Sequence, residues 1–175
     1  MKKLMMSVAI SMFIFSSTSY AVDGYKGVKF GSSLSELKAA KLCSWKKWEG
    51  KQTKNLQSYY CQDFNFSGQN TIAFAVFYND KFQRLAISIN QNVDPVMKAL
   101  TKKYGTPSST SSQQDYQDVM KFGGSVFVKF DNNTVIVAGN YDVDTNKQTG
   151  QLIYSSPDYE QLLSKLQQES VENDL

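Results

Sequence analysis

Histidine is absent from this 175-residue sequence, and proline is scarce, with 3 residues. The lack of histidine excludes Ser–His–Asp triads, Cys–His nucleophile pairs and the commonest zinc sites, because each of these needs an imidazole. Aromatic residues, in contrast, make up 13% of the chain, which is too many for a disordered protein. A chain of this length favours one folded domain. We therefore expect a single folded domain that is not an enzyme.

The first 21 residues have the pattern of a secretory signal peptide. Lys2 and Lys3 supply positive charge, and residues 4–15 form an apolar stretch broken only by serines. Ser19 and Ala21 then place small residues three and one positions before a cleavage point. The apolar stretch is shorter than the roughly 20 residues that span a bilayer. We expect cleavage after Ala21 and a periplasmic or secreted protein, with an uncleaved N-terminal anchor as the alternative.

Loss of the signal peptide changes the charge of the chain. Two of the lysines leave with it, so the formal net charge falls from +3 to +1. The remaining charge is divided unevenly, because residues 22–104 carry +7 and residues 105–175 carry −6. The two halves either neutralise each other across the fold or form a basic and an acidic face. A net charge this small gives no reason to expect nucleic acid as a partner.

Cys43 and Cys61 are the two cysteines of the chain. An even number of cysteines in an exported protein indicates a disulfide. Free thiols or a redox pair are the alternatives, but the spacing is far from Cys-x-x-Cys. We expect a structural disulfide between Cys43 and Cys61.

Hydrophobic periodicity and turn residues predict many short elements. A capping box at Ser33 and Glu36 begins the first expected helix, which ends near Lys41, and Asp94 is expected to cap the second. The third expected helix starts near Ser156. The expected strands are residues 25–30, 59–66, 71–78, 82–89, 116–122, 126–130, 134–141 and 151–154.

Two of these strands carry expectations about their faces. Residues 59–66 alternate, which places Tyr60 and Phe64 on one face and Cys61 on the other. Residues 71–78 are almost wholly apolar, which is typical of a central strand covered on both faces.

The order of elements predicts an α+β fold with a largely antiparallel sheet and two or three short helices. A helix followed by a β-meander occurs twice, from about Ser33 and from about Asp94. We expect one domain over residues 22–168, followed by a flexible acidic tail over residues 169–175.

Two short motifs resemble segments of small exported bacterial proteins. One is Gly27-Val28-Lys29-Phe30-Gly31-Ser32-Ser33 before a short helix, and the other is the helix end Lys103-Tyr104-Gly105-Thr106-Pro107. The repeated helix-plus-meander is similar to the β-lactamase-inhibitor-protein fold, whose single-unit relative is the small lipoprotein of outer-membrane assembly. This chain departs from that pattern by lacking a lipidated cysteine. The resemblance implies a protein-binding module and assigns no individual residue.

The segment between the cysteines carries the candidate partner-binding residues. Two tryptophans alternate with lysines there, and lysines supply positive charge while indoles supply apolar and stacking area. The alternative is that the tryptophans pack on the sheet and the lysines are solvated. The candidate residues are Trp45, Lys46, Lys47, Trp48, Lys51 and Lys54.

The remaining motif does not indicate a metal site. Asp142-x-Asp144-x-Asn146 begins like a calcium loop, but Lys147 and Ile153 occupy the positions that need glycine and glutamate. We therefore expect no metal and no cofactor.

The function we expect is non-catalytic binding of a protein in the bacterial envelope, as an inhibitor, an immunity-type protein or an assembly accessory. The alternative is a binder of anionic envelope lipid or polysaccharide through the Trp/Lys segment.

Overall fold

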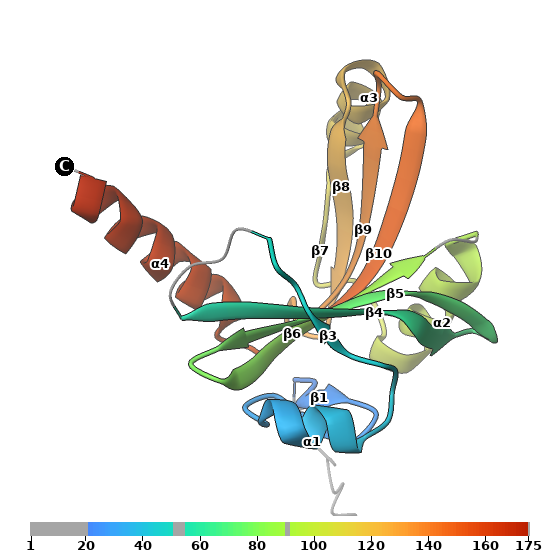
Figure 1. The fold of residues 1–175 in the computed structure, drawn as a ribbon. Coiled ribbons are helices and arrows are strands. Elements are labelled where there is room, and N and C mark those ends of the chain that lie inside the picture. The colour runs from blue at the N-terminus through green and yellow to red at the C-terminus, as the bar shows by residue number, and fades with distance from the viewer. Residues whose placement is uncertain (1–20, 51–54, 90–91, 175) are drawn as a thin grey trace, which may run out of the picture.

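The chain folds as an α+β domain in a computed structural model that describes residues 21–50, 55–89 and 92–174 (Figure 1). The described residues form four helices, an eight-stranded sheet and a two-stranded sheet. Every strand pairing is antiparallel. The predicted fold class is thus confirmed, with one helix more than expected. The signal peptide, apart from Ala21, lies outside the described residues, as do Lys51 and Lys54.

The N-terminal segment forms a small hairpin instead of the predicted single strand. β1 (Gly24–Tyr25) pairs with β2 (Val28–Lys29). Lys26 and Gly27 have φ values of 45° and 86°, which reverse the chain between the two strands. The hairpin contributes Val28 to the core.

The first unit follows the predicted pattern closely. α1 (Leu34–Ala39) begins at the expected capping box, in which the Ser33 hydroxyl accepts from the Glu36 amide and the Glu36 carboxylate accepts from the Ser33 amide. After the two-residue strand β3 (Lys46–Lys47), three long strands form a meander through tight turns. These strands are β4 (Leu56–Phe66), β5 (Gln69–Tyr78) and β6 (Lys81–Ile89).

The second unit begins with α2 (Asp94–Tyr104). The prediction that Asp94 caps this helix is wrong, because Asp94 is its first residue and the cap position is Val93. The Asn92 side-chain oxygen accepts from the Asp94 amide at 2.9 Å, so the asparagine satisfies a donor of the first turn. β7 (Ser109–Thr110) follows the helix.

The predicted strand over residues 116–122 is also wrong, since α3 (Gln113–Phe122) occupies this segment. Ser112 and Asp115 form a second capping box, in which the Ser112 amide donates to the Asp115 carboxylate at 2.7 Å. Tyr116, Val119 and Met120 have the i, i+3, i+4 spacing of one helix face. The cap and this spacing outweigh the β-propensity of the individual residues.

The chain then completes its second meander and ends in a helix. The strands are β8 (Gly124–Phe130), β9 (Val135–Asp142) and β10 (Lys147–Ser155). The terminal helix α4 (Tyr159–Asp174) takes up most of the segment predicted to be a flexible tail. None of the helices in the described part of the chain is long and apolar enough to cross a membrane.

The strand order of the large sheet is β3-β4-β5-β6-β10-β9-β8-β7. Read inward from either edge, the sheet begins with a two-residue strand and continues with a three-stranded meander. The last strands of the two meanders, β6 and β10, pair in the middle. The two predicted helix-plus-meander units therefore share one sheet, and α3 is an addition to the second unit.

One face of this sheet carries the hydrophobic core. α1, α2 and the β1–β2 hairpin contribute Leu37, Leu100 and Val28 to it, and α1 and β1 lie on the same side of β4 in Figure 1. The strands contribute fully buried side chains, among them Phe64, Phe77, Phe82, Leu85, Ile87, Phe130 and Val135. The core thus spans both units.

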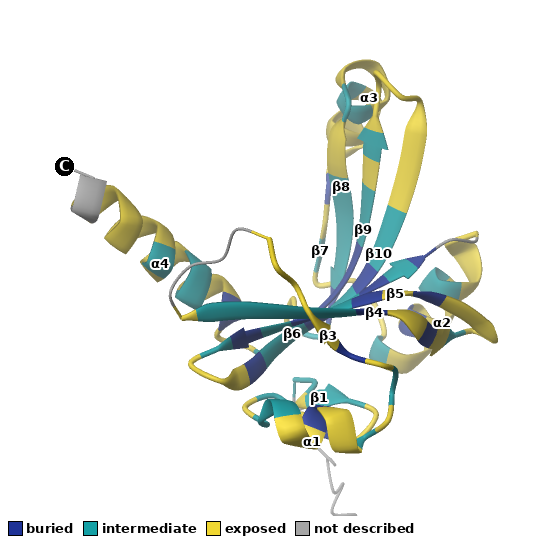
Figure 2. Cartoon of the chain, in the orientation of Figure 1, coloured by how far each residue is buried: buried dark blue, intermediate teal, exposed yellow. Residues whose placement is uncertain are grey.

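The opposite face of the sheet is only partly covered: Ile136 of β9 and Ser155 of β10 are buried on it, whereas the β5 side chains on this face are not. Ile72 is 38% exposed, and Phe74, Val76 and Tyr78 are half-buried, so the prediction that residues 71–78 are covered on both faces is wrong. Figure 2 shows intermediate burial along the visible strands of both meanders. α4 begins on this side, where the Tyr159 ring lies 4.1 Å from the Arg84 guanidinium carbon. We call this surface the open face.

The predicted disulfide between Cys43 and Cys61 is present, with its Cα atoms 6.2 Å apart. It joins the segment that leads into β3 to the middle of β4. Such bonds are typical of proteins that fold in an oxidising compartment.

Replacing both cysteines, as in Cys43→Ser with Cys61→Ser, is expected to lower the free energy of unfolding by about 3 kcal/mol, because the bond closes a loop of 18 residues in the unfolded chain. Urea denaturation measures this loss. A reductant should destabilise the wild-type chain by a similar amount and leave the double variant unchanged. Equal stability of the oxidised and reduced wild type would contradict a stabilising role.

Candidate functional site

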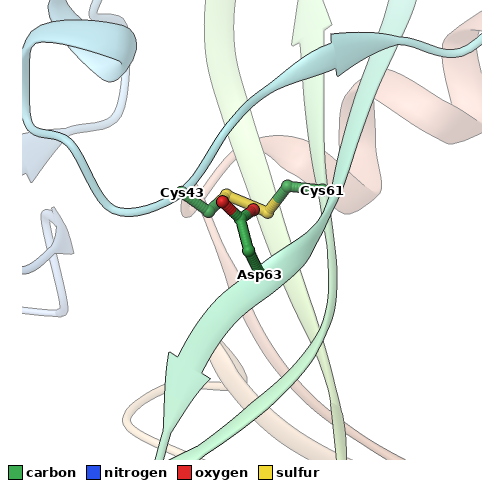
Figure 3. A group of neighbouring side chains, drawn as sticks. All are labelled: Cys43, Cys61 and Asp63. Atoms are coloured by element: carbon green, nitrogen blue, oxygen red, sulfur yellow. A yellow bond between two sulfur atoms is a disulfide. The ribbon is translucent and has the colours of Figure 1, made fainter.

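The disulfide and a neighbouring carboxylate hold the start of the candidate segment (Figure 3). The Asp63 carboxylate accepts from the Ser44 amide at 3.0 and 3.2 Å. Hydrogen bonds from the hydroxyl and then the amide of Ser44 lower the pKa of Asp63 below its usual value. The segment before β3 is therefore tied to β4 by a covalent bond and by a charge-assisted hydrogen bond.

Cys43, Cys61 and Asp63 are the one group of possible metal ligands that lie close together within the described residues. Their ligand atoms are all within 4.8 Å of one another. The two sulfurs are bonded to each other, however, and a metal needs free thiolates. With the disulfide formed, this group is a structural corner of the fold.

The four described candidate residues of the Trp/Lys segment have different environments. Trp45 is only 7% exposed, and its ring packs at 6.5 Å from that of Phe64 in the core. Lys46 and Lys47 are both exposed on the edge strand β3. Because side chains alternate along a strand, these lysines point to opposite faces of the sheet.

Lys46 lies on the open face and Lys47 on the core side. Lys46 is directly opposite Tyr60 in the β3–β4 pair, and Lys47 is opposite Tyr59. Directly paired residues share a face. Tyr59 packs against the buried Phe77, whereas Tyr60 packs against the half-buried Phe74 of the open face.

Trp48 joins Tyr60 and Phe74 on the open face, and we call these three residues the aromatic patch. The Trp48 ring centroid is 5.7 Å from that of Tyr60 and 6.0 Å from that of Phe74, both in edge-to-face geometry. Trp48 remains 44% exposed. Edge-to-face packing fixes the indole on the sheet while leaving much of its surface available to a partner.

Gly50 allows the chain to pass close to this indole. A Cβ atom added at Gly50 would lie 2.1 Å from the Trp48 Nε1 atom, so a larger residue would push the indole aside. The glycine therefore helps to set the position of Trp48.

A cross-strand row continues the aromatic patch across the whole sheet. Successive pairings place the row residues on one face, and we call this set the open-face row. Its members are Lys46, Tyr60, Phe74, Ala86, Ile153, Ile136, Lys129 and Ser109. The row has an apolar centre, with Lys46 at one end and Lys129 followed by Ser109 at the other. The Lys129 ammonium also lies 4.7 Å from the centre of the Phe127 ring.

Sequence reasoning missed Tyr60, Phe74 and Lys129 as surface residues of a candidate site. The predicted alternation placed Tyr60 with Phe64, but a β-bulge between Cys61 and Phe64 shifts the register, so Cys61 and Phe64 are both buried. The apolar run of residues 71–78 was the feature of the sequence from which Phe74 could have been identified. Lys129 joins the row only through tertiary pairing.

Comparisons with known proteins place the chain in a family without naming an activity. A family model described as "Uncharacterised protein" matches residues 25–174. A protein of Haemophilus influenzae, described as "Uncharacterized protein", is 34% identical over 183 aligned positions that cover both chains completely. No solved structure matches the chain, so no structure supports the expected likeness to the β-lactamase-inhibitor-protein fold.

The two tryptophans should behave differently on substitution. Trp45→Ala is expected to lower the free energy of unfolding by about 3–5 kcal/mol, because it leaves a cavity in the core. Trp48→Ala should cost about 1 kcal/mol, since it removes mainly edge-to-face contacts. Urea denaturation followed by circular dichroism measures both losses.

Fluorescence of the single-tryptophan variants provides the control. Trp45→Phe leaves the exposed indole, which acrylamide should quench readily, and Trp48→Phe leaves the buried one, which should resist quenching. Equal quenching of the two variants would contradict the different burial of the indoles.

Proposed function

Since the chain belongs to this family, whose description assigns no activity, we propose from its structure that it is a non-catalytic binding module of the bacterial periplasm. Its ligand is a protein that docks on the open face. The single observation that carries this proposal is the open-face row, in which aromatic and aliphatic side chains, half-buried except for the buried Ile136, lie between two lysines.

The aromatic patch has the properties of an interface centre. Tryptophan and tyrosine are enriched among residues that dominate binding energy, because they combine large apolar area with a polar group and few rotatable bonds. Trp48, Tyr60 and Phe74 hold one another by ring contacts, so little side-chain entropy is lost on binding. A preorganised patch of this kind favours a shaped apolar partner surface.

The charges define the chemistry of the partner. Lys46 lies on the edge strand β3, and Lys129 lies on β8, next to the edge strand β7 at the other side of the sheet. A partner that fits this row presents apolar side chains with carboxylates on either side. Such complementarity accelerates association and selects the orientation of the complex.

The position of the lysines favours a protein over an anionic lipid or polysaccharide. Lys47 points to the other side of the sheet from the aromatic patch, so the two lysines of β3 do not act on one surface. The strands of the two meanders also run in very different directions in Figure 1, which makes the sheet a twisted surface. A twisted surface contacts a planar bilayer less completely than it contacts a matching protein.

Two features support the periplasm as the compartment. The disulfide needs an oxidising environment, and the N-terminal sequence has a signal-peptide pattern. Within the periplasm, we propose the role of an inhibitor, an immunity-type protein or an envelope-assembly accessory.

Photo-crosslinking in the producing cell tests the docking surface. A photoreactive phenylalanine analogue at Ile72, which is exposed on the open face, should crosslink a discrete protein. The same analogue at Lys47, on the other side of the sheet, is the matched control. Equal crosslinking from the two positions would contradict the proposal.

The protein identified in this way is then purified for binding measurements. Phe74→Ala is expected to weaken binding at least tenfold, about 1.4 kcal/mol, because it removes the centre of the patch. Lys46→Glu should slow association at low salt, whereas Lys47→Glu should have little effect. Lys46→Glu changes an exposed side chain, so it tests the surface without disturbing the fold.

Vesicles provide the test of the lipid alternative. Wild-type protein is mixed with vesicles of 30% phosphatidylglycerol in phosphatidylcholine and sedimented. We expect no binding at physiological salt. Vesicle binding that Trp48→Ala and Lys46→Glu both abolish would overturn the protein-partner proposal in favour of an anionic lipid.

A further inference from the structure

The backbone nitrogen of Val22 is bound by a carboxylate from the second unit of the fold. It donates a hydrogen bond to Asp131 Oδ2 at 2.5 Å, across 109 residues of sequence. Asp131 belongs to the turn between β8 and β9. The contact therefore joins the start of the folded chain to its second unit.

The turn holds this carboxylate in a fixed position. Asp131, Asn132 and Asn133 have φ values of 51°, 54° and 69°, a left-handed conformation that aspartate and asparagine tolerate well. Ser108 and Ser109 both donate from their hydroxyl groups to the Asn133 side-chain oxygen, at 2.8 and 3.0 Å. The Asp131 acceptor is therefore preorganised by its own turn.

Thr134 shares the same carboxylate oxygen. Its hydroxyl lies 3.1 Å from Asp131 Oδ2 and donates at 2.6 Å to the Asp131 carbonyl. Thr134 is buried and Asp131 is half-buried. An ionic contact at this position is less screened by solvent than one on the open surface.

The segment after Val22 is held in place as well. The Val22 side chain packs against the hydrophobic core, and the Asp23 carbonyl accepts from the Phe30 amide at 2.8 Å. The Asp23 carboxylate pairs with Lys29 at 3.5 Å, so this neighbouring acidic group already has a cation beside it. Asp131 is the carboxylate that remains directed at the Val22 nitrogen.

Two independent observations concern the Val22 nitrogen. The small residues Ser19 and Ala21 predict that cleavage makes Val22 the first residue of the exported chain. The fold, in turn, binds the nitrogen of that same residue. Cleavage at this bond would turn a neutral amide into a charged amine without moving it from its acceptor.

We propose that Ala21–Val22 is the processing site of this protein and that cleavage creates an α-ammonium on Val22 that forms an ion pair with Asp131. The proposal rests on the export stated above and is independent of the binding role. A signal peptidase of the envelope hydrolyses the peptide bond with one water molecule. Ala21 gains the hydroxyl and becomes a carboxylate, and the Val22 nitrogen gains protons and becomes the ammonium.

The ion pair strengthens an existing contact. The uncleaved chain offers one neutral N–H, whereas an ammonium offers positive charge and three donors. Hydrogen bonds between ionised groups are roughly twice as strong as neutral ones. Removal of the signal peptide would thus strengthen the contact between the segment before the β1–β2 hairpin and the turn between β8 and β9. Asp131 would then bind the mature N-terminus.

The natural N-terminus is established first. Intact-mass analysis and N-terminal sequencing of the exported protein should show a chain that starts at Val22. Cleavage at another bond, or a retained signal peptide, would overturn the proposal.

The ion pair is then measured in two purified forms, one that starts at Val22 and one that keeps Ala21 as an added first residue. Reductive methylation with labelled formaldehyde marks the α-amine for a pH titration by NMR. In the Val22 form, we expect the pKa of the α-amine to lie about one unit above its usual value of about 7.7, because Asp131 stabilises the charged form. The Ala21 form should show the usual pKa.

Asp131→Asn in both forms is the matched control. Asparagine keeps the left-handed turn and the acceptor for Thr134 but removes the charge. The variant should abolish the pKa shift in the Val22 form and leave the Ala21 form unchanged. Since the pKa of the amine is raised in the folded state, the added stability of the Val22 form should be complete below about pH 7.7 and lost as the pH rises through the folded-state pKa.

Thermal unfolding at pH 7 gives the second readout. Asp131→Asn should lower the melting temperature of the Val22 form by about 2–4 °C more than that of the Ala21 form. Equal pKa values in the two forms, or equal losses in melting temperature, would overturn the ion pair. Neither result would affect the partner-binding measurements on the open face.

Discussion

The pairing of β6 with β10 is the interaction on which the rest of the structure depends. It joins the last strands of two separate meanders over six residue pairs, from Gly150 opposite Ile89 to Ser155 opposite Arg84. This junction places Ile87 and Leu152 in the core and Ala86 and Ile153 on the open face. Without it, each meander would be a small sheet whose core face is too narrow for independent stability. The continuous core and the open-face row are both consequences of this one pairing.

The second constraint is the uneven cover of the sheet. Three elements, α1, α2 and the β1–β2 hairpin, contribute to the same core. An antiparallel sheet can leave its other face to solvent, but that face is then usually polar. Here Trp48, Phe74 and Ile72 remain partly exposed on it. The exposed surface of these apolar residues contributes nothing to the stability of the fold. We therefore relate the aromatic patch to binding.

Local signals in the sequence predicted most of the elements well. The capping box at Ser33 and the apolar runs of β5 and β6 are short-range features, and the structure confirms them. The errors arose where two local signals competed or where an irregularity intervened. In α3, the capping box at Ser112 prevailed over β-forming side chains. In β4, the bulge after Cys61 changed which residues face the core, and a strict period of two does not anticipate a bulge.

The sequence by itself determined the α+β class, the disulfide and the segment between the cysteines as a place of interest, because these follow from periodicity, cysteine number and local composition. It could not separate Trp45 from Trp48, or Lys46 from Lys47. Only the tertiary structure decided that one indole is buried and the other exposed, since that depends on which strands lie beneath them. It also brought Lys129 into the row with Lys46 and placed the Val22 nitrogen on Asp131. These contacts join residues far apart in the chain, and long-range pairing leaves no local pattern from which they could be inferred.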